Sequence, residues 1–98
     1  MKMILVMTAK SGKTREAVAA LKAGNEYVSS KYGTKGEVYM QIMGGTAGTF
    51  YIIGDYPDLA SIQTFQAKIM ADDKYWERVQ TLVDVMIDPP TVTLLQPI

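Results

Sequence analysis

Residues 37–53 read EVYMQIMGGTAGTFYII, two alternating apolar runs on either side of a glycine-rich turn. The runs cover residues 37–43 and 50–53, and such alternation is typical of strands, whose successive side chains point to opposite faces. Two strands joined by residues 44–48 predict a β-hairpin. Both faces of this hairpin carry large apolar side chains, so we expect both faces to be covered.

The chain before the hairpin predicts a strand and then a helix. Residues 3–7 form a short apolar run that is typical of a buried strand, and residues 13–32 change to helical spacing. Ser11 is placed to cap this helix, because a serine oxygen accepts a hydrogen bond from the free amides of a first turn. Gly33 is placed to end the helix, because glycine readily adopts the left-handed conformation found there.

The chain after the hairpin predicts a broken helix and a last strand. Pro57 suits the first turn of a helix, and Asp72 or Asp73 is placed to cap a second helical segment. The Asp-Pro-Pro sequence at 88–90 predicts the end of that segment, because proline donates no backbone hydrogen bond and restricts its predecessor. Residues 91–96 alternate again and predict the last strand.

This order of elements predicts one ferredoxin-like βαββαβ domain of the α+β class over residues 1–98. Its four-stranded antiparallel sheet would carry helices on one face only. The other face would expose more apolar surface than the roughly few hundred Å² that soluble monomers usually tolerate. We therefore expect a homodimer in which two sheets cover one another.

The composition excludes several chemistries. The 98 residues contain no cysteine and no histidine, which excludes disulfides, thiolate metal sites and Ser–His–Asp or Cys–His catalysis. Ten Lys and Arg residues balance ten Asp and Glu residues, whereas a nucleic-acid-binding protein normally has a basic excess. The first apolar run is too short for a signal peptide or membrane span. We expect a cytoplasmic protein that binds neither nucleic acid nor membrane.

Two stretches resemble the dimeric α/β-barrel superfamily, which includes the NIPSNAP-like proteins and the antibiotic-biosynthesis monooxygenases. Residues 6–21, VMTAKSGKTREAVAAL, are similar to the strand, Gly-Lys turn and helix of that family. Residues 54–78, GDYPDLASIQTFQAKIMADDKYWER, resemble NIPSNAP-like domains in their aromatic-Pro opening, amphipathic helix, acidic pair and aromatic pair. The resemblance implies a dimer with facing sheets and a pocket in each subunit between sheet and helices.

The resemblance also implies several activities, because the superfamily includes cofactor-independent oxygenases, haem-degrading enzymes, isomerases and proteins without an assigned activity. The haem-degrading type is least similar, since this chain has no histidine to ligate iron. The oxygenase type uses an asparagine and a tryptophan with nearby tyrosines, and Asn25 and Trp76 are the candidates for these catalytic roles. The resemblance thus implies a monooxygenase without metal or cofactor that acts on a small apolar or aromatic ligand. The alternative is a non-catalytic ligand-binding or structural dimer.

The candidate site residues each have a structural alternative. Asn25 falls near the centre of the apolar face of the first helix. An amide there either forms hydrogen bonds within the protein or points into a pocket. Trp76 falls at the edge of an apolar helix face, where it either packs in the core or lines a pocket. Four aromatic residues are candidates for ligand binding: Tyr39, Tyr51, Phe65 and Tyr75.

Three further features have ordinary explanations that compete with functional ones. Tyr39 and Tyr51 share one face of the hairpin, so a dimer interface is the alternative to a pocket. Residues 11–14, Ser-Gly-Lys-Thr, resemble the end of a phosphate-binding loop, but Met7 occupies the position of its first glycine, which favours a simple turn. The acidic pair at 72–73 fits a helix cap better than a cation site, which needs more oxygen ligands.

Overall fold

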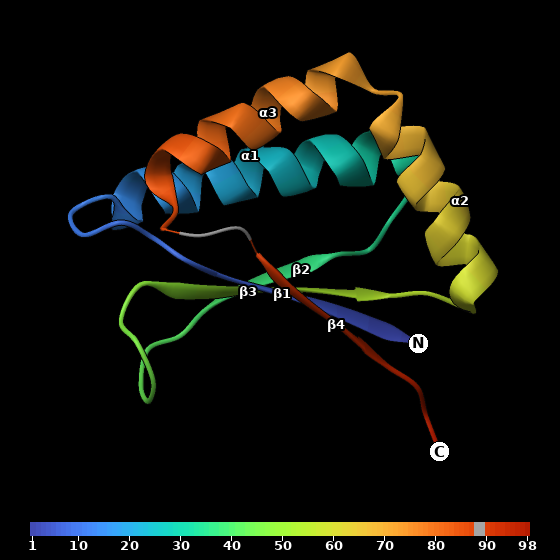
Figure 1. The fold of residues 1–98 in the computed structure, drawn as a ribbon, viewed down its shortest axis with the longest axis horizontal. Helices are drawn as coiled ribbons and strands as arrows, with labels where there is room; N and C mark the ends of the chain where they lie inside the picture. Colours follow the sequence, from blue (N-terminus) through green and yellow to red (C-terminus); the bar gives the residue numbers. More distant parts are fainter. Residues whose placement is uncertain (88–89) are drawn as a thin grey trace.

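The computed structural model describes residues 1–87 and 90–98. These residues form a four-stranded antiparallel sheet with helices on one face (Figure 1). The elements follow in the order β1 (Lys2–Thr8), α1 (Thr14–Tyr32), β2 (Glu37–Met40), β3 (Thr49–Asp55), α2 (Leu59–Met70), α3 (Asp73–Val85) and β4 (Thr91–Leu95). The predicted α+β class and βαββαβ order are confirmed.

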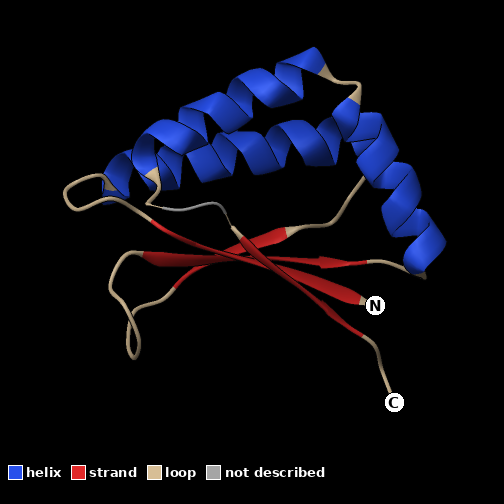
Figure 2. Ribbon diagram, viewed as in Figure 1, coloured by secondary structure: helices blue, strands red, loops and turns tan. Residues whose placement is uncertain are grey.

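The strands lie in the order β2-β3-β1-β4, and each neighbouring pair is antiparallel. In the central pair, Leu5 lies opposite Ile52 and Met7 lies opposite Phe50. These side chains face the helices and join the hydrophobic core. The alternate residues, among them Val6 and its partner Tyr51, therefore point to the other face of the sheet. Figure 2 shows that no helix lies on that face among the described residues.

The tightest packing lies at one end of the molecule. There the fully buried Phe50 of β3 meets the small and branched side chains of α1 and the end of α3. This core cluster consists of Met7, Ala9, Ala17, Leu21, Phe50, Val85 and Met86. The cluster includes no residue of α2, whose Ile62 is buried outside it.

The strand β2 is shorter than the sequence predicts. It ends at Met40 instead of residue 43, because the chain turns at Gly44 and Gly45, whose φ angles of 79° and 55° lie in the left-handed region. Ile42 and Met43, predicted as strand residues, instead stand in the β2–β3 loop with side chains 85% exposed. The sheet therefore continues from β2 into an apolar loop.

The ends of α1 agree only in part with the sequence. The prediction that Ser11 caps α1 is wrong, because a turn between Lys10 and Lys13 precedes the helix and no side chain caps it. Gly33 ends the helix as predicted, with a φ of 69° and its amide donating to the carbonyl of Ser29. The turn over residues 10–13 supports the simple-turn interpretation of the Ser-Gly-Lys-Thr sequence.

The boundaries of α2 and α3 are set by aspartates. Pro57 precedes α2, and Asp58 caps that helix by accepting from the Ser61 amide at 2.8 Å. Asp72 caps α3 by accepting from the Tyr75 amide at 3.2 Å, which confirms the predicted cap. α3 ends at Val85. The predicted stop at 88–90 falls partly on residues 88–89, which lie outside the described residues.

Candidate functional site

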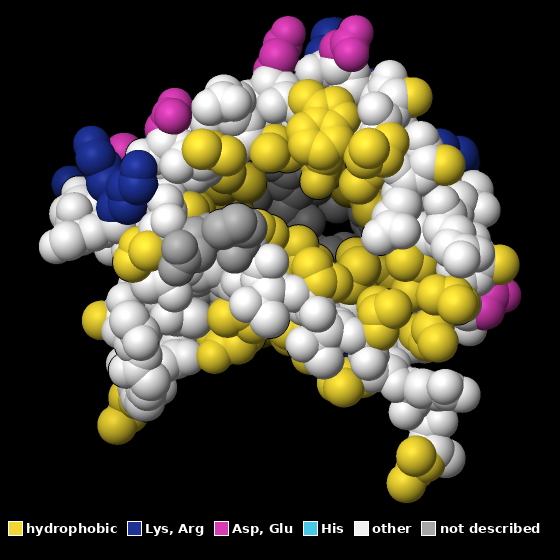
Figure 3. All heavy atoms as spheres, in the orientation of Figure 1, with side chains coloured by type: hydrophobic (Ala, Val, Ile, Leu, Met, Phe, Trp, Pro, Cys, Tyr) yellow, Lys and Arg dark blue, Asp and Glu magenta, His cyan; other side chains and the backbone are white. Residues whose placement is uncertain are grey.

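The molecule is hollowed between the helix layer and the sheet, with hydrophobic side chains gathered around the opening (Figure 3). On the sheet side, Val92 and Leu94 of β4 lie opposite Leu5 and Met3, so they point toward the helix layer. Nevertheless Val92 is 55% exposed and Leu94 is 44% exposed. The helix-facing side of β4 is thus left uncovered, and this leaves an apolar entrance.

Aromatic rings from α1, α2 and the segment after β3 meet on the helix-facing side of the sheet. The Phe65 ring of α2 lies 5.7 Å from the Tyr32 ring in an edge-to-face arrangement and 5.9 Å from the Tyr56 ring. Tyr56 lies over Gly54, where a Cβ atom would stand 3.1 Å from Cε2 of the tyrosine ring. Gly54 therefore makes room for Tyr56 on the helix-facing side of β3. We call this space, lined by Tyr32, Tyr56, Phe65 and Tyr75, the aromatic hollow.

Two hydroxyl groups of the aromatic hollow have no hydrogen-bond partner among the described residues. Tyr56 and Tyr75 are both half-buried, and neither hydroxyl bonds to another described group, whereas the Tyr32 hydroxyl donates to Asp72. Burial raises the pKa of Tyr56 and of Tyr75, and the nearby Tyr75 raises the pKa of Tyr56 further. Both groups therefore stay protonated and able to donate at neutral pH.

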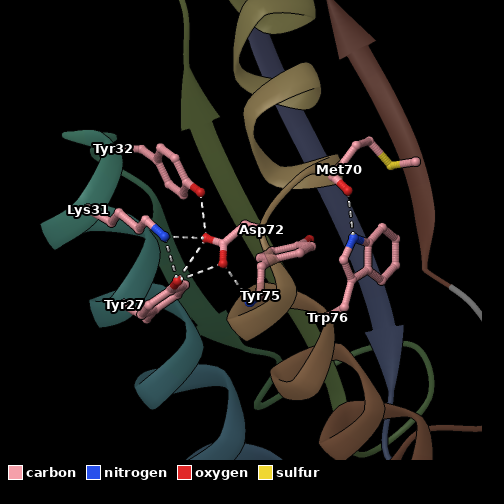
Figure 4. A network of polar contacts seen from close by, with 7 residues as sticks. All are labelled: Tyr27, Lys31, Tyr32, Met70, Asp72, Tyr75 and Trp76. Atoms are coloured by element: carbon pink, nitrogen blue, oxygen red, sulfur yellow. Dashed lines mark hydrogen bonds and ion pairs between the residues drawn. The ribbon is translucent and has the colours of Figure 1, made fainter.

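A buried carboxylate fixes the start of α3 beside the aromatic hollow (Figure 4). Asp72 is 6% exposed, and its carboxylate accepts from the hydroxyls of Tyr27 and Tyr32 and from Nζ of Lys31. The Tyr27 contact is 2.7 Å and the Lys31 contact is 3.0 Å. Hydrogen bonds from the Tyr32 hydroxyl first, and then from the Tyr27 hydroxyl and the Lys31 ammonium, hold the pKa of Asp72 well below its ordinary value. The last turns of α1 thereby hold the N-terminus of α3 in place.

Three of the predicted site residues lie together at this end of the molecule. The Tyr75 and Trp76 rings are 5.6 Å apart and edge-to-face, and Nε1 of Trp76 donates to the carbonyl of Met70 at 3.2 Å. Trp76 remains 43% exposed, which is more than a core residue and consistent with a place at the entrance. Phe65 lies in the aromatic hollow itself.

The other three predicted site residues lie elsewhere. Nδ2 of Asn25 donates to the carbonyl of Gly36 at 3.0 Å, so the amide joins α1 to the start of β2. This contact favours the structural interpretation of Asn25. Tyr39 and Tyr51 lie directly opposite one another on β2 and β3, on the sheet face that points away from the aromatic hollow. Their hydroxyls donate to Glu37 and Gln41.

Sequence reasoning missed Tyr32, Gly54 and Tyr56. The Tyr32 hydroxyl, at the end of α1, donates to Asp72, which caps α3. No local sequence pattern indicates a contact between residues so far apart in the chain. Gly54 and Tyr56 do carry a signal, because a glycine two residues before an aromatic residue leaves space on the same strand face. That spacing was the available clue to the aromatic hollow.

Other parts of the described chain offer weaker sites. A shallow groove between α1 and α3 is lined by Tyr27, Lys74, Glu77, Arg78 and Thr81. Its long charged side chains are well solvated, and its Tyr27 hydroxyl already donates to Asp72, so we assign it no ligand. Among the described residues, no group of three or more acidic side chains is arranged to hold a metal ion, and no helix could cross a membrane.

Comparison with solved structures identifies proteins that share this fold. No protein-family model and no curated protein sequence matches the chain. An uncharacterized NIPSNAP domain protein from Burkholderia xenovorans superposes with a TM-score of 0.84 at 14% identity, over 99% of this chain and 93% of its own. The chain has the NIPSNAP-domain fold. A protein from Agrobacterium tumefaciens gives a TM-score of 0.81 at 14% identity over 99% and 92% of the two chains.

The same fold includes a solved antibiotic biosynthesis monooxygenase, with a TM-score of 0.76 at 15% identity over 99% of this chain and 97% of that one. These matches confirm the resemblance to the dimeric α/β-barrel superfamily at the level of the fold. At such low identity the NIPSNAP fold does not by itself carry an activity, which must come from the site.

Proposed function

We propose that residues 1–98 form a single homodimeric domain that binds a small, largely apolar, aromatic ligand in the aromatic hollow. The proposal depends on one observation: Tyr56 and Tyr75 are half-buried residues, and neither hydroxyl has a hydrogen-bond partner among the described residues. No fully buried polar side-chain atom of the described residues lacks a partner, so these two hydroxyls are accessible and able to donate to a ligand. A ligand oxygen would accept hydrogen bonds from them, and the ring of Phe65 would add apolar contact.

A cofactor-independent monooxygenase is the catalytic form of this proposal. The position of Trp76 beside Tyr75 at the entrance supports it, as does the fold shared with an antibiotic biosynthesis monooxygenase. In such a reaction O₂ converts a CH₂ group of an electron-rich substrate to a carbonyl, and the second oxygen atom leaves as water. The substrate supplies all four electrons, so the protein has to hold the substrate anion and exclude bulk water.

The contact between Asn25 and Gly36 favours the alternative, a non-catalytic binding or structural dimer, over an oxygenase that needs this amide. Oxygen uptake with anthrone, whose CH₂ group lies between two aromatic rings, separates the two. A monooxygenase would form anthraquinone faster than buffer at neutral pH, and the rate would fall in Trp76→Phe. A rate equal to that in buffer would leave ligand binding as the function.

Ligand binding itself is tested by titrating the ¹⁵N-labelled protein with 2-naphthol. The chain has one tryptophan, so its single indole N–H signal reports on the entrance. We expect saturable shifts of the Trp76 indole and Tyr75 amide signals, with the Tyr39 amide unchanged. Phe65→Leu should weaken binding by about 3- to 10-fold through loss of the aromatic pairs, while Tyr39→Leu should not. Absence of any saturable shift in the folded protein would refute the proposal.

A further inference from the structure

We infer that the β2–β3 loop of each subunit packs against the sheet edge of its partner, on an apolar patch formed by Ile87 and Val92. This contact places Ile42 and Met43 of the loop beside the entrance to the partner's aromatic hollow, since Val92 belongs to that entrance. The inference rests on the homodimer of the proposed function, and it names the loop and the surface that meet in that homodimer.

The β2–β3 loop, residues 41–48, is held in shape by hydrogen bonds of its own. The side chain of Gln41 accepts from the Tyr51 hydroxyl at 2.7 Å and donates to the carbonyl of Gly44. The two large apolar side chains of the loop are nevertheless 85% exposed. A loop that is ordered before binding loses less entropy when its side chains are buried against a partner.

The loop and the patch lie at the same end of the sheet, on opposite sides of its two central strands. The loop is joined to the end of β1 by a hydrogen bond from the Ala9 amide to the Gly48 carbonyl at 2.9 Å. On the other side of β1, the Ile87 amide donates to the carbonyl of Thr8 at 2.9 Å. Val92 of β4 follows along the same edge. This edge therefore presents two apolar side chains that are 54% and 55% exposed.

Face-to-face packing of two sheets about a two-fold axis brings the loop and the patch together. When the axis runs parallel to the strands, β2 of one subunit lies across from β4 of the other, because the strand order is β2-β3-β1-β4. The loop extends beyond the sheet on its uncovered side (Figures 1 and 3). The stretch from Met40 to Met43 can span about 10 Å, which is the usual distance between packed sheets. The apolar side chains of the loop therefore reach the edge of the partner's sheet.

The uncovered sheet face alone provides a small interface. Its outline, four strands about 4.8 Å apart and roughly 20 Å long, is on the order of 400 Å². Part of it is occupied by charged side chains, those of Lys2, Glu37 and Asp55. A specific and stable interface buries about 800 Å² of accessible surface on each partner. The exposed loop and the patch add to the face, and residues 41–48 carry no charged side chain that would oppose burial.

Cross-linking tests whether the loop meets the patch, because the chain has no cysteine of its own. The Met43→Cys/Ile87→Cys variant should give a covalent dimer with a short bismaleimide. Either single variant should give little, since equivalent residues stand on opposite sides of the two-fold axis. Met43→Cys/Thr64→Cys is the matched control, because Thr64 is exposed on α2 in the helix layer. Denaturing gels measure the yield of covalent dimer.

Sedimentation equilibrium tests the free energy of the same contact. Met43→Ser and Ile87→Ser should each weaken the dimer by about 10-fold, because an apolar side chain is lost from the interface. The two changes together should weaken it by much less than the roughly 100-fold expected of independent sites, since both remove one contact. Thr64→Ser should leave the dimer unchanged. Circular dichroism checks that each variant folds, as expected for side chains that are exposed in the single subunit.

The outcomes separate the contact from the homodimer. If the wild type is a dimer but the paired cysteines give no more covalent dimer than the control, the inference fails and the homodimer stands. Independent weakening by the two serine changes leads to the same conclusion. A folded wild-type monomer at micromolar concentration overturns both the contact and the homodimer, while ligand binding is measured separately by the naphthol titration.

Discussion

At Gly54, the lack of a side chain decides where the ring of Tyr56 can lie. A strand residue with a Cβ atom would come within 3.1 Å of that ring, and the ring is held from above by Phe65. Because the ring is confined on both sides, it has little freedom to move away. The floor of the aromatic hollow therefore depends on a single glycine.

We expect Gly54→Ala to destabilise the protein by about 1 kcal/mol through overpacking and to weaken 2-naphthol binding. Gly24→Ala is the matched control, because nothing lies within 4 Å of a Cβ at that helix position. In α1 the same change should stabilise by up to about 1 kcal/mol, since alanine favours helix over glycine. Urea unfolding and the naphthol titration measure both effects. Equal stability changes in the two variants would contradict the packing argument.

Single residues differ in how far the sequence could place them. The sequence indicated Phe65 and Tyr75 as candidates for ligand binding, and both are half-buried in the structure, with the Phe65 ring beside that of Tyr56. The partner of Asn25 could not be predicted, because Gly36 comes near only through the turn that follows α1. For Tyr39, alternation predicted the neighbour on the same face but not which face meets the helices, because both faces are apolar.

At the scale of elements, α3 is attached to α1 through the carboxylate of Asp72. This one group caps α3 and accepts hydrogen bonds from Tyr27, Lys31 and Tyr32 near the end of α1. A buried carboxylate is stable only if it is paired and hydrogen-bonded, and Asp72 meets that condition. The position of Tyr75 in the first turn of α3 is set by the same group.

We expect Asp72→Asn to lower the melting temperature by several degrees at neutral pH, because an amide is uncharged and accepts at one atom only. Asp73→Asn is the matched control at the adjacent, exposed position, where the loss should be small. Differential scanning calorimetry of both variants measures the difference. Similar melting temperatures for the two variants at pH 7 would show that the contacts of Asp72 do not hold the helices together.

The pH dependence follows from the direction of the shift. The pKa of Asp72 is lower in the folded protein than in the unfolded chain, chiefly through the Tyr32 hydroxyl, so its contribution is complete above the unfolded value of about 3.9. It is lost progressively as the pH falls below that value. The stability difference between wild type and Asp72→Asn should therefore shrink as the pH falls through this range.

The order of elements was predictable, while their ends depended on local turns. Strand alternation and helical spacing predicted the sequence of elements, because each pattern reflects burial on one side of an element. The end of β2 was mistaken since apolar residues continue past Met40 into the β2–β3 loop. The start of α1 was mistaken because the turn at Gly12 uses backbone hydrogen bonds and leaves no need for the Ser11 side chain.

At the scale of the whole molecule, one face of the sheet has no described element over it. Val6 and Ile4 of β1, with Tyr51 and Ile53 of β3, point to this face, while the helices cover the other. The β2–β3 loop and the C-terminal end extend beyond the sheet on this side (Figures 1 and 3), and the loop carries the exposed Ile42 and Met43. Exposure of such an apolar surface to water is unfavourable, and we propose that the sheet of a second copy covers it.

We expect the wild-type protein to sediment as a dimer at micromolar concentration, and Val6→Lys to sediment as a monomer. Val6 lies on a central strand, so a lysine there would place one charge from each subunit in the middle of an apolar interface. Such burial of an unpaired charge should weaken association by at least about 100-fold. Thr64→Lys is the control, because it adds the same charge at an exposed position of α2 and should leave the dimer intact. A folded wild-type monomer at this concentration, by sedimentation equilibrium and circular dichroism, would mean that the apolar face is stable in water and that the dimer proposal is wrong.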